Sequence, residues 1–381
     1  MEKVKLTDIC DFQGGSQPPK EEWSFDEQEG YIRMLQIRDF TQGERVTPEY
    51  IKISNTTKMC EANDILIARY GASIGKILTG LAGAYNVAIM RTIPDTSRIK
   101  KLYLYYYLKS PYFQNAILNV GSRAAQAGFN KEDLSKLDIE CPELIKQDKI
   151  IAVLEKLECI IEKRKIELSN LDDLIKARFV EMFGDPVSNP YGYDKVALSD
   201  LADIKIGPFG SLLHKEDYID GGHPLLNPSH IVDGKVSPDD KLTIYDEKYE
   251  ELSAYQLKTG DVVMGRRGEM GRCAVVPEDG FLCGTGSMLI RTKGEVTADY
   301  IQKIISFPSF KKTIEDMAVG QTMPNLNVPI VSGFQIIKPP MEVQDRYYAF
   351  AEQVNKSKVA VQKALDETQI LFDSLMQKYF G

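Results

Sequence analysis

The second half of this chain repeats the first half. Residues 4–9 (VKLTDI) correspond to residues 196–201 (VALSDL), and residues 64–71 (DILIARYG) correspond to residues 261–268 (DVVMGRRG). The offset begins near 192 residues and settles near 197, where Phe183-Gly184 corresponds to Phe380-Gly381. A period of this length is that of a whole domain. The sequence therefore predicts two related domains.

Each repeat ends in a segment typical of a long helix. From Gln147 to Phe183 there is neither Gly nor Pro, and the residues of one face recur at alternating steps of four and three, as in a coiled coil. The predicted seam of the first helix consists of Ile150, Leu154, Leu157, Ile161, Arg164, Leu168, Leu171, Ile175, Arg178 and Met182. The equivalent seam of the second helix consists of Tyr347, Ala351, Val354, Lys358, Val361, Leu365, Thr368, Phe372, Leu375 and Tyr379.

The charged seam positions favour pairing between these two helices. Arg164 is equivalent to Val361, and Lys358 is equivalent to Ile161, so neither helix would form an ideal seam with a copy of itself. The alternative is that each helix lies on its own domain. A length of roughly 37 residues, about 55 Å at 1.5 Å per residue, exceeds a domain of this size and argues against that alternative.

The rest of each repeat predicts strands and short helices. Aromatic and β-branched runs at 31–37 and 282–291 indicate strands between long loops. Short helices are predicted over 103–108 and 300–305, and each should end at the following Ser-Pro or Phe-Pro, because proline disfavours helical geometry in the residue before it. The predicted fold class is α+β, with two mixed α/β domains, each followed by one long α-helix. The expected boundaries are 1–142 and 187–339 for the domains, and 143–186 and 340–381 for the helices.

No motif for catalysis, metal binding or cofactor binding is duplicated. Residues 71–77 (GASIGKI) have one residue too few between the glycines for a phosphate-binding loop, and Ile follows the lysine where Ser or Thr is required. The histidines His214, His223 and His230 lack metal-ligand spacing. The repeats share turns and helices, so the sequence predicts a non-catalytic binder with two recognition domains.

Charge and composition restrict the possible binding partners and the cellular compartment. The net charge of −8 argues against binding nucleic acid through overall charge, but it leaves room for local basic clusters or a basic partner subunit. The first residues contain no apolar signal segment, and the six cysteines form no C-x-x-C pair. These features predict a soluble protein of the reducing cytoplasm.

Taken together, the repeated motifs resemble those of the specificity subunit of type I restriction-modification enzymes. The resemblance covers the full length. It lies in the turns at 64–75 and 261–271, the segments 137–142 and 334–339 that lead into Gln-Asp, and the helix end at 177–186 (ARFVEMFGDP). It implies that each domain is a target recognition domain reading one half of a bipartite DNA site. The helices would pair antiparallel, fix the spacing of the half-sites and dock two methyltransferase subunits.

Under this resemblance, all chemistry resides in the partners. The methyltransferase subunits would use S-adenosylmethionine to methylate adenine, and restriction (motor-nuclease) subunits would use ATP and Mg. No cofactor, metal or catalytic residue is expected in this chain. The alternative is a two-domain coiled-coil scaffold that binds protein or peptide, which the net charge of −8 favours somewhat.

The candidate DNA-binding residues fall into two groups. For phosphate contacts we expect basic residues in the Gly-flanked turns, where backbone and side chain can approach the duplex closely: Arg69, Lys76, Arg266, Arg267 and Arg272. The alternative for Arg69 and Arg266 is an internal ion pair. For base reading we expect Arg123, Gln126, Gln321 and Asn325, because these side chains can pair bidentately with guanine or adenine. The alternative for these base-reading loops is that each is an ordinary polar loop that caps the following turn. His214 and Lys215 are weaker candidates for DNA contacts.

Overall fold

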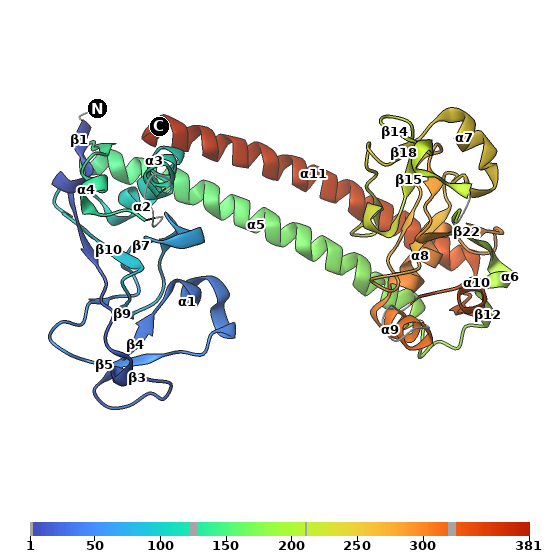
Figure 1. Ribbon diagram of the computed structural model, residues 1–381, viewed down its shortest axis with the longest axis horizontal. Helices are drawn as coiled ribbons and strands as arrows, with labels where there is room; N and C mark the ends of the chain where they lie inside the picture. The colour runs from blue at the N-terminus through green and yellow to red at the C-terminus, as the bar shows by residue number, and fades with distance from the viewer. Residues whose placement is uncertain (1–2, 122–127, 210–211, 319–324) are drawn as a thin grey trace. The chain divides into compact units, whose positions relative to one another are not determined.

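The computed structural model describes residues 3–121, 128–209, 212–318 and 325–381 (Figure 1). Two compact units are present: residues 1–168 with 360–381, and residues 169–359. The long helices α5 (Leu144–Phe183) and α11 (Met341–Phe380) each contribute one part to both units. The predicted fold class, two mixed α/β domains each followed by one long helix, is confirmed.

Among the described residues, the first unit contains a four-stranded sheet, a five-stranded sheet and a strand pair. The four-stranded sheet has the order β2 (Cys10–Gly14), β10 (Ile89–Pro94), β7 (Leu66–Ala68), β8 (Ile77–Leu78). The five-stranded sheet has the order β3 (Trp23–Ser24), β5 (Tyr50–Lys52), β4 (Tyr31–Leu35), β9 (Gly83–Tyr85), β6 (Met59–Cys60). β1 (Lys3–Lys5) pairs with β11 (Asp138–Glu140), and the short helices are α1 (Ile37–Gln42), α2 (Lys101–Lys109), α3 (Pro111–Gly121) and α4 (Lys131–Leu134).

The second unit repeats the central sheet and the strand pair. Its corresponding sheet has the order β13 (Ala202–Ile206), β22 (Ser287–Thr292), β19 (Val262–Gly265), β20 (Cys273–Val275), and β12 (Lys195–Ala197) pairs with β23 (Gln335–Ile337). A further sheet has the order β14 (Tyr218–Ile219), β18 (Thr243–Ile244), β15 (His223–Leu226), β21 (Leu282–Cys283), and β16 (Ile231–Val232) forms a hairpin with β17 (Lys235–Val236). The short helices are α6 (Leu198–Leu201), α7 (Asp246–Glu251), α8 (Ala298–Ser306), α9 (Pro308–Met317) and α10 (Val328–Ser332).

The prolines mark the helix boundaries as predicted. α2 and α8 cover the expected helices, and Ser110 and Phe307, the residues before proline, are extended. The predicted strand over 31–37 is too long, because β4 ends at Leu35 and α1 begins at Ile37. Its capping residue Gln36 shares reciprocal hydrogen bonds with Asp39, which start a helix where the apolar run suggested a strand.

In each unit, one end of each long helix enters the hydrophobic core. In the first unit, Phe380 from the end of α11 packs on Tyr103 at 5.0 Å between ring centroids, in a core that also contains Ile150 from the start of α5. In the second unit, Phe183 from the end of α5 packs at 5.2 Å on Tyr300, which is 197 residues after Tyr103. Since the start of one helix meets the end of the other in each core, the two helices are antiparallel within each unit.

A buried glutamine connects each long helix to its domain. The side-chain oxygen of Gln147 accepts a hydrogen bond from the backbone N–H of Lys100 at 2.8 Å, and its amide nitrogen donates to the carbonyl of Pro142 at 2.7 Å. Gln344 accepts from the backbone of Thr297 at 3.3 Å and donates to the carbonyl of Pro339 at 3.0 Å. The glutamine of the Gln-Asp pair seen in both repeats of the sequence therefore makes the same structural contact twice.

The predicted seam residues lie along the side of each helix that is at least half-buried. Ile150, Leu154, Ile161 and Ile175 are buried in α5, and Arg164 hydrogen-bonds the carbonyl of Ala364 and the hydroxyl of Thr368. In the second unit, Lys358 forms an ion pair with Asp172. No helix in the described part of the chain is both long enough and apolar enough to cross a bilayer.

Candidate nucleic-acid interface

In both repeats, the Gly-flanked turn meets the end of the loop predicted to read bases. In the first unit, Tyr70 forms an antiparallel bridge with Gly128. In the second unit, the bridge joins Arg267 to Asn325, residues that are each 197 positions further along the chain. In each domain the turn thus lies beside the described end of that loop.

The glycines of these turns are required by geometry. Gly271 has a φ of +73°, and a Cβ at this position would lie 2.9 Å from the carbonyl oxygen of Ile305. Gly75, its counterpart, has a φ of +81° and would meet the side chain of Gln114 at 2.9 Å. The glycine of each turn therefore packs closely against a neighbouring helix, and a residue with a Cβ would not fit there.

Arg69 and Arg266 each hydrogen-bond a residue at the described end of the loop. The Nε atom of Arg69 donates to the carbonyl of Phe129 at 3.3 Å, and that of Arg266 donates to Oδ1 of Asn325 at 3.1 Å. Both side chains are half-buried, and neither forms an ion pair with any described acidic residue. Burial, together with the charge of Arg267, lowers the pKa of the Arg266 guanidinium below its usual value. Arg69 and Arg266 thus occupy internal positions. They bond uncharged oxygens of Phe129 and Asn325, and not the acidic partner that an internal ion pair would require.

The neighbouring side chains face solvent. Tyr70 is 38% exposed and has the guanidinium of Arg69 over its ring at 5.0 Å. Arg267 and Lys76 are exposed, and their side chains make no hydrogen bond or ion pair with a described residue. Of the five predicted phosphate-binding residues, these two are the ones that are both exposed and not paired with a described acidic residue.

Arg272 differs from its counterpart Lys76. Its guanidinium binds the carboxylate of Glu269 at 2.6 and 3.1 Å and the carbonyl of Pro228 at 3.2 Å. Glu269 also accepts from Lys311 at 3.2 Å, and hydrogen bonds from these two cations lower the pKa of its carboxyl. The first repeat has no acidic residue between Gly71 and Lys76, so only the second turn is neutralised.

The remaining predicted residues are placed only in part. Arg123, Gln126 and Gln321 lie outside the described residues. Asn325 is half-buried and is engaged by Arg266, and the backbone N–H of His214 donates to the carboxylate of Asp217 at 2.7 Å. Tyr70 was not among the residues predicted from the sequence to bind DNA. It becomes a candidate because its backbone bridges to Gly128 at the end of the loop. Within the described ranges, no group of three His, Cys, Asp or Glu side chains could hold a metal ion.

Comparison with known proteins identifies the family to which this chain belongs. The family described as the type I restriction modification DNA specificity domain matches the chain twice, over residues 1–170 and 190–368. The chain therefore belongs to this family, whose members are the non-catalytic DNA-recognition subunits of type I restriction-modification systems.

Individual relatives agree with this assignment. The MjaVIII specificity subunit of Methanocaldococcus jannaschii is 21% identical over 90% of this chain and 83% of its own length. The MjaIX specificity subunit of the same organism is 22% identical over 98% of this chain and 91% of its own length.

Solved structures share the fold over the whole chain. A chain from a study of complex assembly and conformational transition in the type I R-M system covers 100% of this chain and 97% of its own length, with a TM-score of 0.67 and 18% identity. The S subunit of the type I system from M. genitalium covers 100% and 96%, with a TM-score of 0.56 and 15% identity.

Proposed function

We propose that each domain of this chain reads one half of a bipartite double-stranded DNA site. The observation that carries this proposal is the duplicated junction of turn and loop, with an unneutralised cation beside it in each copy: Lys76 in the first domain and Arg267 in the second. Equivalent positions carry different side chains, since Tyr70 and Gly128 correspond to Arg267 and Asn325. Two copies of one framework with different side chains can read two different half-sites.

The proposal assigns the helix pair to partner docking. α5 and α11 carry exposed apolar side chains away from their buried seam, and such residues are typical of protein interaction surfaces. They include Ile145, Ile166, Leu174, Val359, Ile370 and Leu371. Two methyltransferase subunits would bind here, and restriction (motor-nuclease) subunits would join them.

The partners would supply the cofactors in this scheme. S-adenosylmethionine would be bound by the methyltransferase subunits, and ATP and Mg by the restriction subunits. The proposal includes a cytoplasmic location for the assembled enzyme, where S-adenosylmethionine and ATP are available. This chain would decide where on the DNA that chemistry takes place.

Exchange of one domain tests the proposal. Residues 1–142 are replaced by the equivalent part of a related specificity subunit, and methylated sites are mapped by genome-wide sequencing in cells that also express the partners. One half of the methylated site should change and the other should stay. A change in both halves, or in neither, would contradict independent reading. The unmodified chain, expressed with its partners, serves as the control. The purified chain alone should transfer no methyl group from S-adenosylmethionine to DNA.

A further inference from the structure

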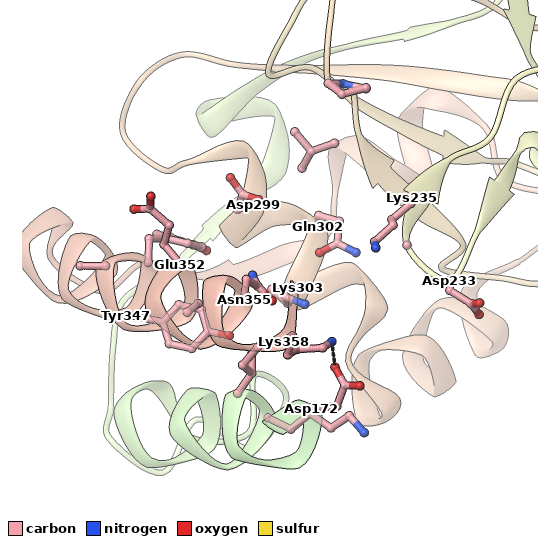
Figure 2. Close-up of a pocket in the computed structure, with 18 of the residues that line it drawn as sticks. Asp172, Asp233, Lys235, Asp299, Gln302, Lys303, Tyr347, Glu352, Asn355 and Lys358 are labelled. Atoms are coloured by element: carbon pink, nitrogen blue, oxygen red, sulfur yellow. Dashed lines mark hydrogen bonds and ion pairs between the residues drawn. The ribbon is translucent and has the colours of Figure 1, made fainter. Parts of the chain in front are cut away.

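A large cleft in the second unit lies between α8, the first part of α11, the last part of α5 and the β16–β17 hairpin (Figure 2). Its volume is about 950 Å³. α8 contributes Asp299, Gln302 and Lys303, and α11 contributes Glu352 and Asn355. All of these elements belong to the second unit, so the cleft is complete within it.

A smaller cleft occupies the first unit. It has a volume of about 500 Å³ and lies between α2 and the first part of α5. α2 contributes Leu102, Tyr105 and Tyr106, and α5 contributes Glu155 and Glu158.

The two clefts are the same feature of the repeated fold. Each of the five residues named for the first cleft has its counterpart, 197 positions later, among the five named for the second. Thr79 and Val275, which follow the Gly-flanked turns, also line the two clefts and also correspond, at an offset of 196 because the second turn is one residue shorter. The β16–β17 hairpin, which contributes Lys235 and Val236, adds a wall to the second cleft only.

Most of the lining has diverged in chemistry between the copies. In the first cleft the hydroxyl of Tyr106 donates to Glu158 at 2.8 Å, whereas Lys303 and Asn355 stand at these positions in the second cleft. The exposed Leu102 is replaced by Asp299. No single small ligand would suit both linings.

One charged residue is the same in both clefts. Glu155 and Glu352 are equivalent, and both are exposed. Glu155 forms no ion pair with a described residue, and Glu352 pairs with Lys356 one turn further along α11 in a contact that is about 70% exposed on both sides and therefore weak. Among the charged groups that line the clefts, this carboxylate is the one that both clefts share, and in each cleft it is accessible to an arriving cation.

Identical partners bound to a duplicated scaffold must meet equivalent surfaces, as subunits do around a symmetry axis. We infer that each cleft takes the same segment of one methyltransferase subunit, and that a Lys or Arg side chain of this segment pairs with Glu155 in the first cleft and Glu352 in the second. This inference rests on the proposed function, which supplies two identical partners. Because the linings differ, the two copies bind with unequal affinity.

The stoichiometry of the complex tests this assignment. Native mass spectrometry of the full chain mixed with the methyltransferase subunit of the same system should detect two bound subunits. Glu155→Lys and Glu352→Lys should each leave one tightly bound subunit, with at least about tenfold weaker binding of the other, because the substitution places like charges together. The double variant should lose tight binding at both clefts.

Matched controls use exposed acidic residues of the two domains that line neither cleft and do not lie on the long helices. Glu29→Lys changes a position before β4 in the first unit, and Glu247→Lys changes a position on α7 in the second unit. Both should still bind two subunits. Retention of two subunits by the double cleft variant, or equal losses in the controls, would overturn the inference. Failure of the unmodified chain to bind any methyltransferase subunit would overturn the proposed function itself.

Photo-crosslinking gives a readout that does not depend on a loss of binding. p-Benzoylphenylalanine at Leu102 and, in a separate variant, at Asp299 should crosslink to the methyltransferase subunit. The same probe at Ile93, an exposed position on β10, should not. If the subunit crosslinks from Ile93 and from neither cleft, the docking site lies elsewhere and the inference is wrong.

Discussion

Gln147 and Gln344 show how a single buried polar residue can join two kinds of structure. Each is fully buried and hydrogen-bonds both the N-cap residue of a domain helix and the proline two residues before its own long helix. Both hydrogen bonds use backbone N–H and carbonyl groups that do not take part in the hydrogen bonding of a sheet or helix. The side chain thereby fixes where the long helix leaves the domain.

Replacing Gln147 with methionine should destabilise the first unit. The variant keeps the volume but leaves the N–H of Lys100 and the carbonyl of Pro142 without this partner, at a cost of about 1–3 kcal/mol in the free energy of unfolding. Denaturant unfolding followed by circular dichroism measures the change. Gln353→Met, at an exposed position, serves as control and should shift stability by less than about 0.5 kcal/mol. Equal effects of the two substitutions would contradict the role given to Gln147.

The free and neutralised cations of the turns should differ in their effect on DNA binding. In the complex with partner subunits, Lys76→Ala and Arg267→Ala should each reduce the salt dependence of binding by about one unit in the slope of log K against log salt. Arg272→Ala should change the slope much less, because Glu269 already neutralises this guanidinium. DNA binding measured over a series of salt concentrations gives the slopes. A loss for Arg272→Ala as large as that for Lys76→Ala would refute this ranking.

The sequence identified the basic residues of the turns but did not show which of them are exposed and free to contact DNA. Arg69 and Arg266 each follow a strand and are half-buried, and each hydrogen-bonds a residue about 60 positions further along the chain. The neutralisation of Arg272 had a local signal, since Glu269 lies three residues before it and has no acidic counterpart in the first repeat. Local signals could be read in the sequence, whereas the distant contacts required the fold.

At the scale of elements, the long helices were the most predictable part of the chain, because their periodicity continues for many turns without Gly or Pro. Shorter elements were predicted less completely. Pro111 and Pro308 predict the ends of α2 and α8, and in the structure they also begin α3 and α9. The β16–β17 hairpin was missed, yet Asp233-Gly234 is a typical two-residue hairpin turn, and both residues have positive φ, 49° and 73°.

Paired substitutions on α5 test the predicted seam. Leu154 is fully buried in the core of the first unit, and its neighbour Val153 is 42% exposed. Leu154→Ala should lower the free energy of unfolding by about 2–5 kcal/mol through the cavity it leaves, whereas Val153→Ala should change it by less than about 0.5 kcal/mol. Thermal or denaturant unfolding distinguishes these outcomes. Similar values for the two variants would place the seam on a different face.

For the whole molecule, duplication is the property that the sequence revealed most directly. The repeat predicted that two domains share one topology, and the strand orders β2-β10-β7-β8 and β13-β22-β19-β20 confirm it. The duplicated clefts were not predictable, because their walls come from segments about 50 residues apart and their linings have diverged. The repeat indicates where equivalent positions lie, and the structure is needed to identify which of them form a surface.

If the paired helices determine the distance between the two half-sites, lengthening them should change the spacer and leave the bases unchanged. One heptad adds about 10 Å of helix, roughly three base pairs at about 3.4 Å each, and returns the seam to the same face. The duplication should fall in the middle of the pair, at residues 161–167 of α5 and 358–364 of α11, so that the inserted stretches face each other and neither cleft is altered.

The added base pairs also rotate the second half-site by about 100°, given about 10.5 pairs per turn, so part of the extension is opposed by the geometry of the duplex. We therefore expect a methylated site with the same two half-sites, a spacer longer by roughly one to three base pairs, and weaker binding. Methylome sequencing with the partner subunits measures the spacer, and circular dichroism confirms that the lengthened chain folds. A chain with a heptad duplicated in α5 alone is the control, because its seams no longer match. If the doubly lengthened chain folds, binds its partners and still methylates the original spacing, the helices do not determine that distance.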